Sequence, residues 1–381
     1  MRDRDLVETW LRAGLAAVDA EKLTEDAISG LRTATVIAIG KAAPAMCRGA
    51  AAVIGAIDGL CVANHEAPVP PRVELVLGDH PVPGPASFAA GEKALAMAPH
   101  ANLALISGGG SALCEWPRPG IDPEFLATAN RALVACGVSI EEMNLVRGHL
   151  SAIKRGGLGP LPTYLLSDVG GFPPAVVSSG PTFPGPHEPE RVIEILHSIG
   201  LSPSHQVMAA IRAEELRRHE PELVAVVGDG RTAARGVLTA IAPQIARARM
   251  HDSWLEGEVA AAVDSLLSVG QVGVTVATGE TVVAVSGIGR GGRNTHAALL
   301  AARAIAGTGS IFAALATDGV DGTSGAAGAI VDGETISRGG DPSQALETFD
   351  SASYLRRTGD LLRYGPTGTN VADLWLIWVP R

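Results

Sequence analysis

Several patterns that would place this 381-residue sequence in a large protein class are absent from it. Acidic residues (40) outnumber lysines and arginines (30), and the formal net charge of −10 disfavours nucleic acid as a partner, because phosphates need a basic face. The four cysteines show no C-x-x-C spacing, as is typical in a reducing cytosol. The amino terminus has no apolar stretch, and the longest charge-free run, 94–114, holds three consecutive glycines. We therefore expect a cytoplasmic protein with neither a signal peptide nor a membrane span.

Motifs of several enzyme classes are missing as well. There is no G-x-x-x-x-G-K-[ST] P-loop, no H-E-x-x-H, no protein-kinase H-R-D or D-F-G, and no G-x-S-x-G nucleophile elbow. P-loop nucleoside triphosphatases, zinc proteases, protein kinases and α/β-hydrolases are thereby disfavoured. Phosphate binding without a P-loop remains open.

Glycine, in contrast, is abundant. The chain has 46 glycines and 25 prolines, about 19% of its residues, without a collagen-like period. Its 46% of hydrophobic residues is typical of a globular protein with a sizeable core. This much glycine indicates many tight turns, or many places where the backbone approaches a ligand.

The glycines cluster where short apolar runs end. Ala- and Leu-rich helical stretches separate many of these β-prone runs, which cover 35–39, 103–106, 164–166, 223–227, 281–285 and 311–316. Strand, loop and helix in repetition predict an α/β fold with mostly parallel, Rossmann-like sheets flanked by helices, and 373–379 predicts a terminal strand. A polar stretch ending near Pro221 predicts two domains, 1–221 and 222–381. Ligands of such sheets bind beyond the carboxyl ends of the strands, where the glycines lie.

Three glycine-rich segments are candidate anion sites. Consecutive glycines in Ser107–Ser111 let backbone N–H groups form a nest for phosphate, although a flexible turn has the same composition. Gly365–Asn370 offers hydrogen-bonding groups to a phosphate or a sugar hydroxyl, and equally resembles a bare turn. Gly287–Gly292 matches the dinucleotide pattern G-x-G-x-x-G, but Asp318 lies 31 residues beyond Gly287, further than that fingerprint usually allows. Two arginines in the turn favour a phosphoryl group there.

Charged residues beside these loops are candidates for chemistry. Lys41 follows a strand and starts a helix, where a cation opposes the helix dipole, so either a bound anion or plain exposure would account for it. Arg147, Ser151 and Lys154 have helical spacing, and the shared face would present two cations and a hydroxyl to a substrate carboxylate or to solvent. Aspartates at strand ends could hold Mg²⁺, accept a hydroxyl proton or cap helices: Asp168, Asp229, Asp318 and Asp321.

Taken together, the motifs resemble the type-2 glycerate kinases, which pair an amino-terminal glycerate-kinase domain with a carboxy-terminal MOFRL domain. The matching segments run in family order over nearly the whole chain: 40–43, 78–87, 107–113, 143–154, 167–169, 178–182, 291–294, 316–322, 326–332 and 365–374. The resemblance implies ATP- and Mg²⁺-dependent phosphorylation of D-glycerate at its 2-hydroxyl, in a cleft between two α/β domains. It implies a small hydroxy acid and a nucleotide as partners; neither nucleic acid nor a membrane is expected, and a homodimer stays open.

The resemblance also implies roles for individual residues. Lys41 and Arg293 match positions associated with catalysis in the family, and Asp168 joins them as a candidate catalytic residue. The candidate nucleotide-binding residues are Ser107, Gly108, Gly109, Gly110, Ser111, Gly365, Thr367, Thr369 and Asn370. Arg147, Lys154 and Asn294 are candidate substrate-binding residues, and Asp318 and Asp321 are candidate metal ligands.

Four places depart from the family pattern, at Gly84, Phe172, Thr295-His296 and Ser324-Gly325, where acids or amides are usual. They indicate a changed 2-hydroxy acid, an altered metal arrangement or a catalytically weakened nucleotide-binding homologue. Relatives have also been labelled hydroxypyruvate reductases, so NAD(P)H-dependent reduction of hydroxypyruvate is a second enzymatic hypothesis, consistent with Gly287–Gly292.

Overall fold

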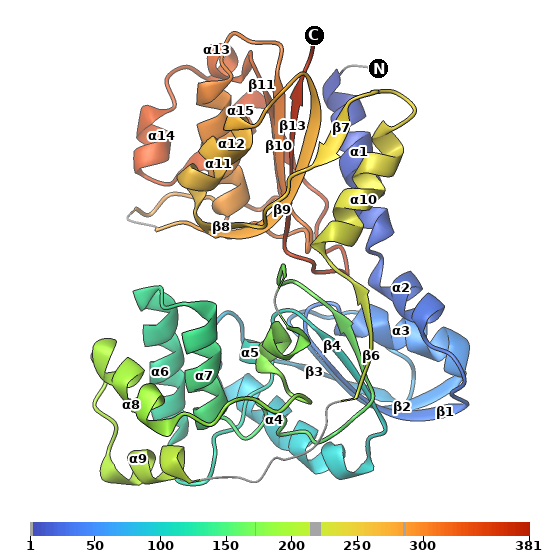
Figure 1. Cartoon of the computed structure of the whole chain (residues 1–381), viewed down its shortest axis with the longest axis vertical. Coiled ribbons are helices and arrows are strands. Elements are labelled where there is room, and N and C mark those ends of the chain that lie inside the picture. Colours follow the sequence, from blue (N-terminus) through green and yellow to red (C-terminus); the bar gives the residue numbers. More distant parts are fainter. Residues whose placement is uncertain (1–2, 172, 214–221, 285–286) are drawn as a thin grey trace. The chain divides into compact units, whose positions relative to one another are not determined.

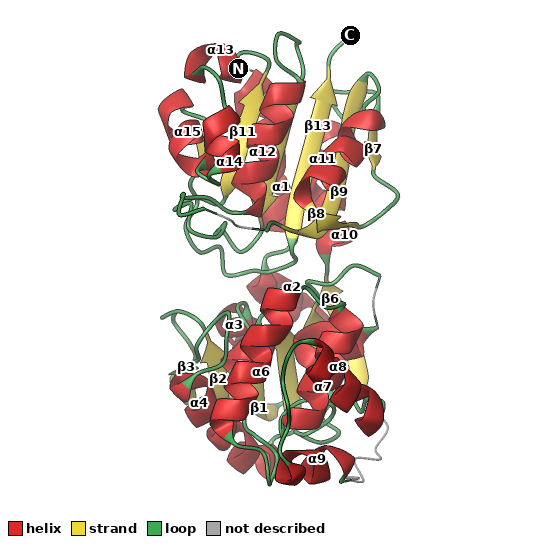
Figure 2. Cartoon of the chain, turned by 90° about the vertical axis from the view of Figure 1, so that its left-hand side faces the viewer, coloured by secondary structure: helices red, strands yellow, loops and turns green. Residues whose placement is uncertain are grey.

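The computed structural model describes residues 3–171, 173–213, 222–284 and 287–381. The chain forms two compact units, each built around its own sheet (Figure 1). Unit 1 consists of 1–19, 168–171 and 228–381, and unit 2 consists of 20–167 and 172–227. Helices flank the strands in both units (Figure 2), which confirms the predicted α/β class.

Unit 2 contains a six-stranded sheet of order β3-β2-β1-β4-β5-β6. Its strands are β1 (Thr33–Ile39), β2 (Ala56–Ala63), β3 (Val73–Leu77), β4 (Leu103–Ser107), β5 (Thr163–Leu166) and β6 (Leu223–Gly228). Its helices are α2 (Ala20–Ala27), α3 (Ala43–Ile54), α4 (Pro85–Met97), α5 (Gly110–Leu113), α6 (Pro123–Cys136), α7 (Ile140–Leu150), α8 (Pro189–Ser198) and α9 (His205–Arg212), with short 3-10 turns η1 (Ala98–His100) and η2 (Pro174–Ser179).

The neighbouring pairs from β3 to β5 are all parallel, as predicted. Strand β4 is buried along its whole length, because helices cover both faces of a parallel sheet. The carboxyl ends of parallel strands meet at one edge of the sheet. The loops after β1 and β4, which carry Lys41 and the consecutive glycines, therefore lie together at that edge.

Unit 1 has a sheet of order β12-β11-β10-β13-β9-β7, with β8 also paired to β9. Its strands are β7 (Ala248–Met250), β8 (Leu255–Glu258), β9 (Gly273–Val282), β10 (Ile311–Ala316), β11 (Gly328–Asp332), β12 (Leu361–Leu362) and β13 (Asp373–Val379). Its helices are α1 (Asp3–Ala17), α10 (Gly230–Ile241), α11 (Val259–Ser268), α12 (Arg293–Ala304), α13 (Thr335–Gly339), α14 (Ser343–Glu347) and α15 (Ser351–Thr358).

The prediction of a mostly parallel sheet is wrong for unit 1. Strands β10, β11, β12 and β13 pair antiparallel, and so do β13 and β9, while only β7 and β8 run parallel to β9. The cause is connectivity: β10 reaches β11 through a loop without a helix, and a parallel pair needs a crossover connection. The predicted terminal strand 373–379 is β13, which lies between β10 and β9.

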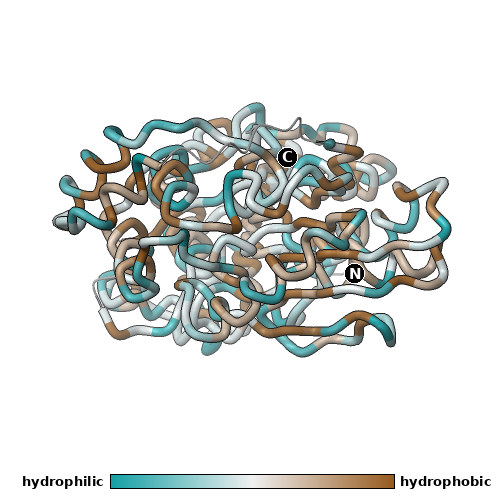
Figure 3. Tube along the Cα trace, turned by 90° about the horizontal axis from the view of Figure 1, so that it is seen from below, coloured by the Kyte–Doolittle hydropathy of each residue, from teal (hydrophilic) through white to brown (hydrophobic). Residues whose placement is uncertain are grey.

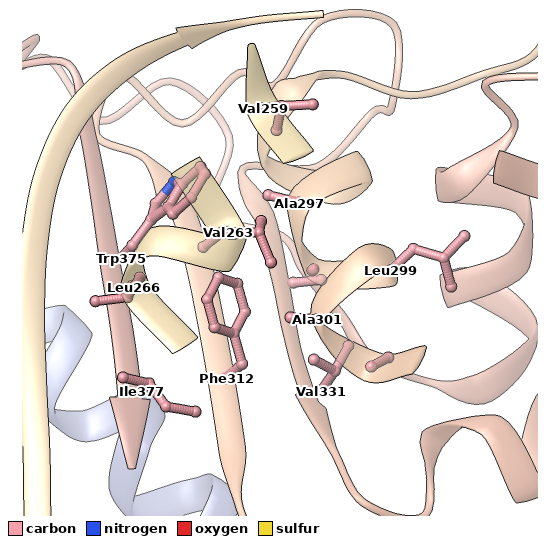
Figure 4. Close-up of a cluster of buried hydrophobic side chains, with 14 of the residues drawn as sticks. Val259, Val263, Leu266, Ala297, Leu299, Ala301, Phe312, Val331, Trp375 and Ile377 are labelled. Atoms are coloured by element: carbon pink, nitrogen blue, oxygen red, sulfur yellow. The ribbon is translucent and has the colours of Figure 1, made fainter. Parts of the chain in front are cut away.

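The core of unit 1 lies between its sheet and the helices α11 and α12 (Figure 4). Phe312 and Trp375, from neighbouring strands, meet edge to face with ring centroids 5.8 Å apart. Hydrophobic and hydrophilic stretches are interspersed along the coloured chain trace (Figure 3). None of the helices in the described ranges is long and apolar enough to cross a bilayer.

The first helix belongs to unit 1 although the residues after it build unit 2. Helix α1 packs against α10 at close range, because Gly14 and Gly236 leave room for the neighbouring helix. A Cβ on Gly14 would lie 2.6 Å from Cγ2 of Val237. The compact units therefore differ from the predicted domain ranges at the amino terminus, and the division at 221/222 stays a prediction.

We expect Gly14→Val to lower the free energy of unfolding by about 1–3 kcal/mol, because the added side chain overpacks the contact between α1 and α10. The measurement is thermal or urea unfolding of the full chain. Ala16→Val, at an exposed position of the same helix, is the control for placing a valine in α1 without overpacking; glycine is a poorer helix former than valine, so propensity alone would not destabilise Gly14→Val. Equal stability of the two variants would contradict the close packing.

Candidate functional site

In unit 2 the loop after β1 is bound to the loop after β4. Gly40 has φ 129°, and a Cβ there would lie 2.2 Å from Oγ of Ser107, so only glycine fits. Lys41 N donates to the carbonyl of Gly108 at 2.9 Å, and Ala42 N donates to Oγ of Ser107 at 3.1 Å. These bonds fix the backbone of Lys41 two residues before α3, rather than in its first turn as the sequence suggested.

The side chain of Lys41 runs over the glycine loop. Gly109 is left-handed at φ 86°, and a Cβ on it would lie 3.0 Å from Cγ of Lys41. A side chain at this position would therefore push the lysine aside. The lysine and the bare backbone of Gly109 together form a small surface suited to an anion.

Two serines that sequence analysis left without a role hold this loop in place. Oγ of Ser178 accepts from Gly110 N at 3.0 Å and donates to the carbonyl of Ser107 at 2.7 Å. Oγ of Ser179 lies 2.8 Å from Oγ of Ser111 and donates to Oδ1 of Asn144 at 2.6 Å.

Both serines are buried and left-handed, with φ 52° and 60°, a conformation that costs a non-glycine residue on the order of 1–3 kcal/mol. The four hydrogen bonds offset that strain. The segment 178–182 matches the family pattern, but its residue types do not predict that two serines adopt positive φ. The consequence for the predicted phosphate nest is that Gly110 N and Oγ of Ser107 are already used inside the protein.

The predicted helical face of Arg147, Ser151 and Lys154 does not form, because α7 ends at Leu150 and Ser151 is extended. Lys154 is 1% exposed and its ammonium forms an ion pair with Glu115, which is also buried. Burial lowers the pKa of Lys154, and the attraction of Glu115 opposes this. Lys154 is thus committed to the interior, whereas Arg147 donates from Nε to Oδ1 of Asn130 at 2.8 Å.

His149, a further residue without a predicted role, attaches the segment 186–188 to α7. Its Nδ1 lies 2.9 Å from the carbonyl of Leu145, while Nε2 accepts from Glu188 N at 3.2 Å and lies 3.1 Å from Nη1 of Arg155. These partners require a neutral ring with its proton on Nδ1. Burial lowers the pKa of His149 to about 4.

In unit 1, Arg293 is the first residue of α12 and is surrounded by carboxylates. Its Nε and Nη2 donate to the two oxygens of Asp373 at 2.6 and 3.1 Å, and Nη1 donates to Glu280 at 3.0 Å. Burial lowers the pKa of Arg293, but Asp373 and Glu280 outweigh it and hold the pKa above its ordinary value. Asp373 is 1% exposed, and burial raises its pKa to about 6 although Arg293 opposes the shift.

The amino terminus of α12 is capped by a carboxylate of the protein itself. Asp321 accepts from Asn294 N at 2.9 Å and from Thr295 N at 2.8 Å, and burial raises its pKa. The buried Asn294 side chain donates to Asp373 at 2.9 Å and accepts from Nε1 of Trp375 at 2.8 Å. Asp321 and Asn294 thus organise the helix start from within the interior.

The loop Gly287–Gly292 does not present its amides to a ligand. The N–H groups of its last four residues donate inside the protein. Gly289 N donates to the carbonyl of Thr348 and Arg290 N to Oδ1 of Asp350, while Gly291 N and Gly292 N donate to Oγ1 of Thr323 and of Thr295. In a dinucleotide fold the pyrophosphate would occupy these amides and the following helix terminus. Here acceptors from neighbouring segments bind the amides of Gly289–Gly292, and Asp321 binds the first amides of α12.

The second predicted nucleotide loop, Gly365–Asn370, lies at the carboxyl end of β10. Oγ1 of Thr367 donates to the carbonyl of Thr317 at 2.5 Å, and Nδ2 of Asn370 donates to Oδ2 of Asp168 at 3.2 Å. Oγ1 of Thr369 is buried and has no hydrogen-bond partner among the residues that the structure describes. Such an atom is costly unless a ligand or water satisfies it.

The same strand end carries Asp318, whose carboxylate accepts from Val320 N at 3.0 Å. In the described ranges no group of three or more His, Cys, Asp or Glu residues could hold a metal ion. The assignment of Asp318 and Asp321 as metal ligands stays a prediction.

The departures from the family pattern fall in varied surroundings. A Cβ on Gly84 would lie 2.6 Å from the carboxylate of Asp79, so Asp79 fills the space of a side chain there. His296 stacks on Phe349 with ring centroids 5.0 Å apart, and its buried Nδ1 finds no hydrogen-bond partner within the described part of the chain. Thr295 accepts from Oγ of Ser351 at 3.0 Å, Gly325 is left-handed at φ 67°, and Phe172 lies outside the described residues.

Comparisons with known proteins agree on one family. The model of the "domain of unknown function" DUF4147 matches residues 6–213, and that of the MOFRL family matches 273–373. A D-glycerate 2-kinase of Thermotoga maritima is 32% identical, with 96% of this chain and 95% of that protein aligned. A putative hydroxypyruvate reductase of Agrobacterium vitis is 34% identical over 90% of this chain and 86% of its own length. The crystal structure of a Thermotoga maritima glycerate kinase superposes with a TM-score of 0.86 at 32% identity, covering 98% and 99% of the two chains.

We expect the stability of the protein to fall between about pH 6.5 and 4 because of His149. Its folded pKa lies below the ordinary value, so the unfolded chain binds the proton more tightly, and stability present above pH 6.5 is lost as the pH falls. The full contribution is about 3 kcal/mol. Urea unfolding against pH, in the wild type and in His149→Gln, measures it. A variant with the same pH dependence as the wild type would refute the assignment.

Proposed function

The chain belongs to the type-2 glycerate kinase family, and we propose that it is an ATP-dependent kinase of the 2-hydroxyl of D-glycerate or a related small 2-hydroxy acid. Likeness to a glycerate kinase over nearly the whole of both chains supports this reaction class. The observation that carries the proposal is local: the side chain of Lys41 lies against the bare backbone of Gly109, in a loop that the strained serines Ser178 and Ser179 hold in place.

Phosphoryl transfer needs positioning and neutralisation of charge more than covalent chemistry from the protein. We assign Lys41 to the charge that develops on the transferring phosphoryl group. Arg293 is assigned the same kind of role; two of its five N–H donors remain after its bonds to Asp373 and Glu280. Arg147 is assigned to the substrate carboxylate. Lys154 and Asn294, which the sequence also suggested, are bonded within the interior and act on the site through the residues they hold.

The nucleotide is assigned to the glycine loop Ser107–Ser111 and to Gly365–Asn370. In the first loop, Gly110 N and Oγ of Ser107 are already hydrogen-bonded within the protein. We therefore assign the contacts with the nucleotide to Gly108, Gly109 and Ser111. In the second, the unsatisfied hydroxyl of Thr369 supports a ligand contact.

Magnesium would accompany ATP in this proposal. Mg²⁺ is usually held by one or two carboxylates together with phosphate oxygens, so a cluster of three protein ligands is not required. Asp168, fixed by Asn370, and Asp318 fit that need as single carboxylates. When bound, the ion would neutralise charge on the phosphates. Asp321 fits less well, since both of its oxygens accept amide protons at the start of α12.

A hydroxypyruvate reductase is the alternative, because relatives carry that name. The geometry favours it less: the amides of Gly289–Gly292 are satisfied within the protein, and Asp321 occupies the helix terminus that a pyrophosphate would need. A catalytically weakened nucleotide-binding homologue is a further alternative, motivated by the departures at Gly84 and His296.

A coupled assay of ADP release with D-glycerate and a panel of small 2-hydroxy acids tests the kinase. NADH absorbance with hydroxypyruvate tests the reductase on the same preparation. ADP release without NADH oxidation is the expected result. Folded protein that binds ATP in calorimetry but turns over no acid would identify the weakened homologue instead.

We expect Lys41→Ala to lower kcat by about tenfold or more, as for the loss of one charge-stabilising contact in the transition state. Lys41→Arg keeps the charge with a different geometry and should lie between the variant and the wild type. Lys93→Ala, an exposed lysine paired with Glu74, is the control for general loss of charge. An unchanged kcat in Lys41→Ala would remove Lys41 from the mechanism.

A further inference from the structure

Asn130 occupies a position where the packing calls for an apolar side chain. The buried residues of α6 are Leu126, Ala129, Asn130 and Leu133, the i, i+3, i+4, i+7 stripe that faces a core. The other three belong to an apolar cluster that joins α6 to α7 and α8. Asn130 is 1% exposed, so its amide has given up water on all sides. A buried amide in such a cluster is unfavourable unless its hydrogen bonds are made.

The two ends of this amide are both used, and they define its orientation. Nδ2 donates to the carbonyl of Leu126 at 3.0 Å, one turn earlier in the same helix. That bond turns Oδ1 toward α7, where it accepts from Nε of Arg147 at 2.8 Å. Asn130 therefore carries a rigid acceptor that holds one edge of the Arg147 guanidinium.

Arg147 has no carboxylate partner of its own in the part of the chain that the structure describes. Glu115, whose charge raises the pKa of Arg147, is already paired with Lys154 and accepts from Trp116 N. Burial lowers the pKa of Arg147, as expected for a cation whose charge is incompletely compensated. With Nε held by Asn130, the edge formed by Nη1 and Nη2 is the one left for a bidentate carboxylate.

The helix that carries Arg147 is bonded to the glycine loop. Asn144, one turn earlier in α7, accepts from Oγ of Ser179, which contacts Oγ of Ser111. Helix α7 and the loop over which Lys41 runs therefore belong to one connected part of unit 2.

We propose that Asn130 is a positioning residue that orients Arg147 to bind the carboxylate of the hydroxy-acid substrate end-on, through Nη1 and Nη2. The inference rests on the proposed function, which supplies the carboxylate substrate, and adds the group that sets the direction of its recognition. Without Asn130, Nε of Arg147 would lose its acceptor and the guanidinium would adopt other rotamers. In those rotamers Nη1 and Nη2 would no longer point together at the substrate carboxylate. The loss would fall on substrate binding rather than on the nucleotide.

The test is a double-mutant cycle on the full-length protein. Asn130→Leu keeps the volume and should raise KM for D-glycerate, or for the best acid of the panel, by about tenfold, with kcat and the KM for ATP changed by less than about twofold. Arg147→Met should raise the same KM at least as much. In Asn130→Leu/Arg147→Met, KM should equal that of Arg147→Met, because Asn130 acts only through Arg147.

Controls separate positioning from folding. Asn102→Leu makes the same substitution at an exposed asparagine before β4, whose Oδ1 accepts from Thr35 N, and should leave KM unchanged. If Asn130→Leu fails to fold, Asn130→Asp keeps the acceptor but adds a negative charge beside the guanidinium. That variant should also raise KM for the acid and not for ATP.

Each outcome decides a separate question. An unchanged KM in Asn130→Leu, or effects that multiply in the double variant, overturns the role of Asn130 while leaving the kinase intact. An unchanged KM in Arg147→Met removes Arg147, and Asn130 with it. If the wild type turns over no acid, the proposed function fails, and Kd for D-glycerate by calorimetry replaces KM in the same cycle; no binding by the wild type overturns both.

Discussion

Two buried carboxylates determine how the charged part of unit 1 is built. Asp321 and Asp373 are each about 1–2% exposed, and together they hold the first residues of α12: the amides of Asn294 and Thr295, the Asn294 side chain and the Arg293 guanidinium. Removing either partner of such a set would leave an uncompensated charge in the interior. The helix start is therefore rigid, and Arg293 can approach a ligand only in the direction that Asp373 permits.

In unit 2, neutral hydroxyl groups rather than carboxylates hold the candidate site in place. Ser107 and Ser178 accept backbone N–H groups of Ala42 and Gly110, and Ser179 contacts the hydroxyl of Ser111. These hydroxyls fix the loops around Lys41 without adding a negative charge. A loop held by carboxylates would repel the anionic groups of a nucleotide.

Sequence patterns predicted the α/β class, the strands β1, β4, β5 and β6 of unit 2 and the terminal strand β13, because continuous apolar runs followed by glycine are typical of buried parallel strands. They did not predict β2 and β3, and they assigned β6 to the second domain although it pairs in the sheet of unit 2. The patterns did not predict that most strands of unit 1 pair antiparallel, since the residues of β10 and β11 are as apolar as those of a parallel pair. For the candidate site, the positions of the glycines and cations could be predicted from the sequence, and the resemblance to the family indicated that they belong to one site. The strained conformation of Ser178, the internal use of Lys154 and the cap formed by Asp321 were not readable, because each depends on a partner far away in the sequence.

The placement of α1 bears on how the chain is made. Residues 3–17 of α1 are synthesised before either sheet, whereas their partner α10 follows more than two hundred residues later. Strand β13, which lies between β10 and β9, is synthesised after every other strand of its sheet. The segments of unit 2 are all made before α10. Helix α1 therefore stays without its packing partner, with its apolar stripe uncovered, while the whole of unit 2 is synthesised. That interval is when a nascent chain is most open to chaperones and to wrong contacts.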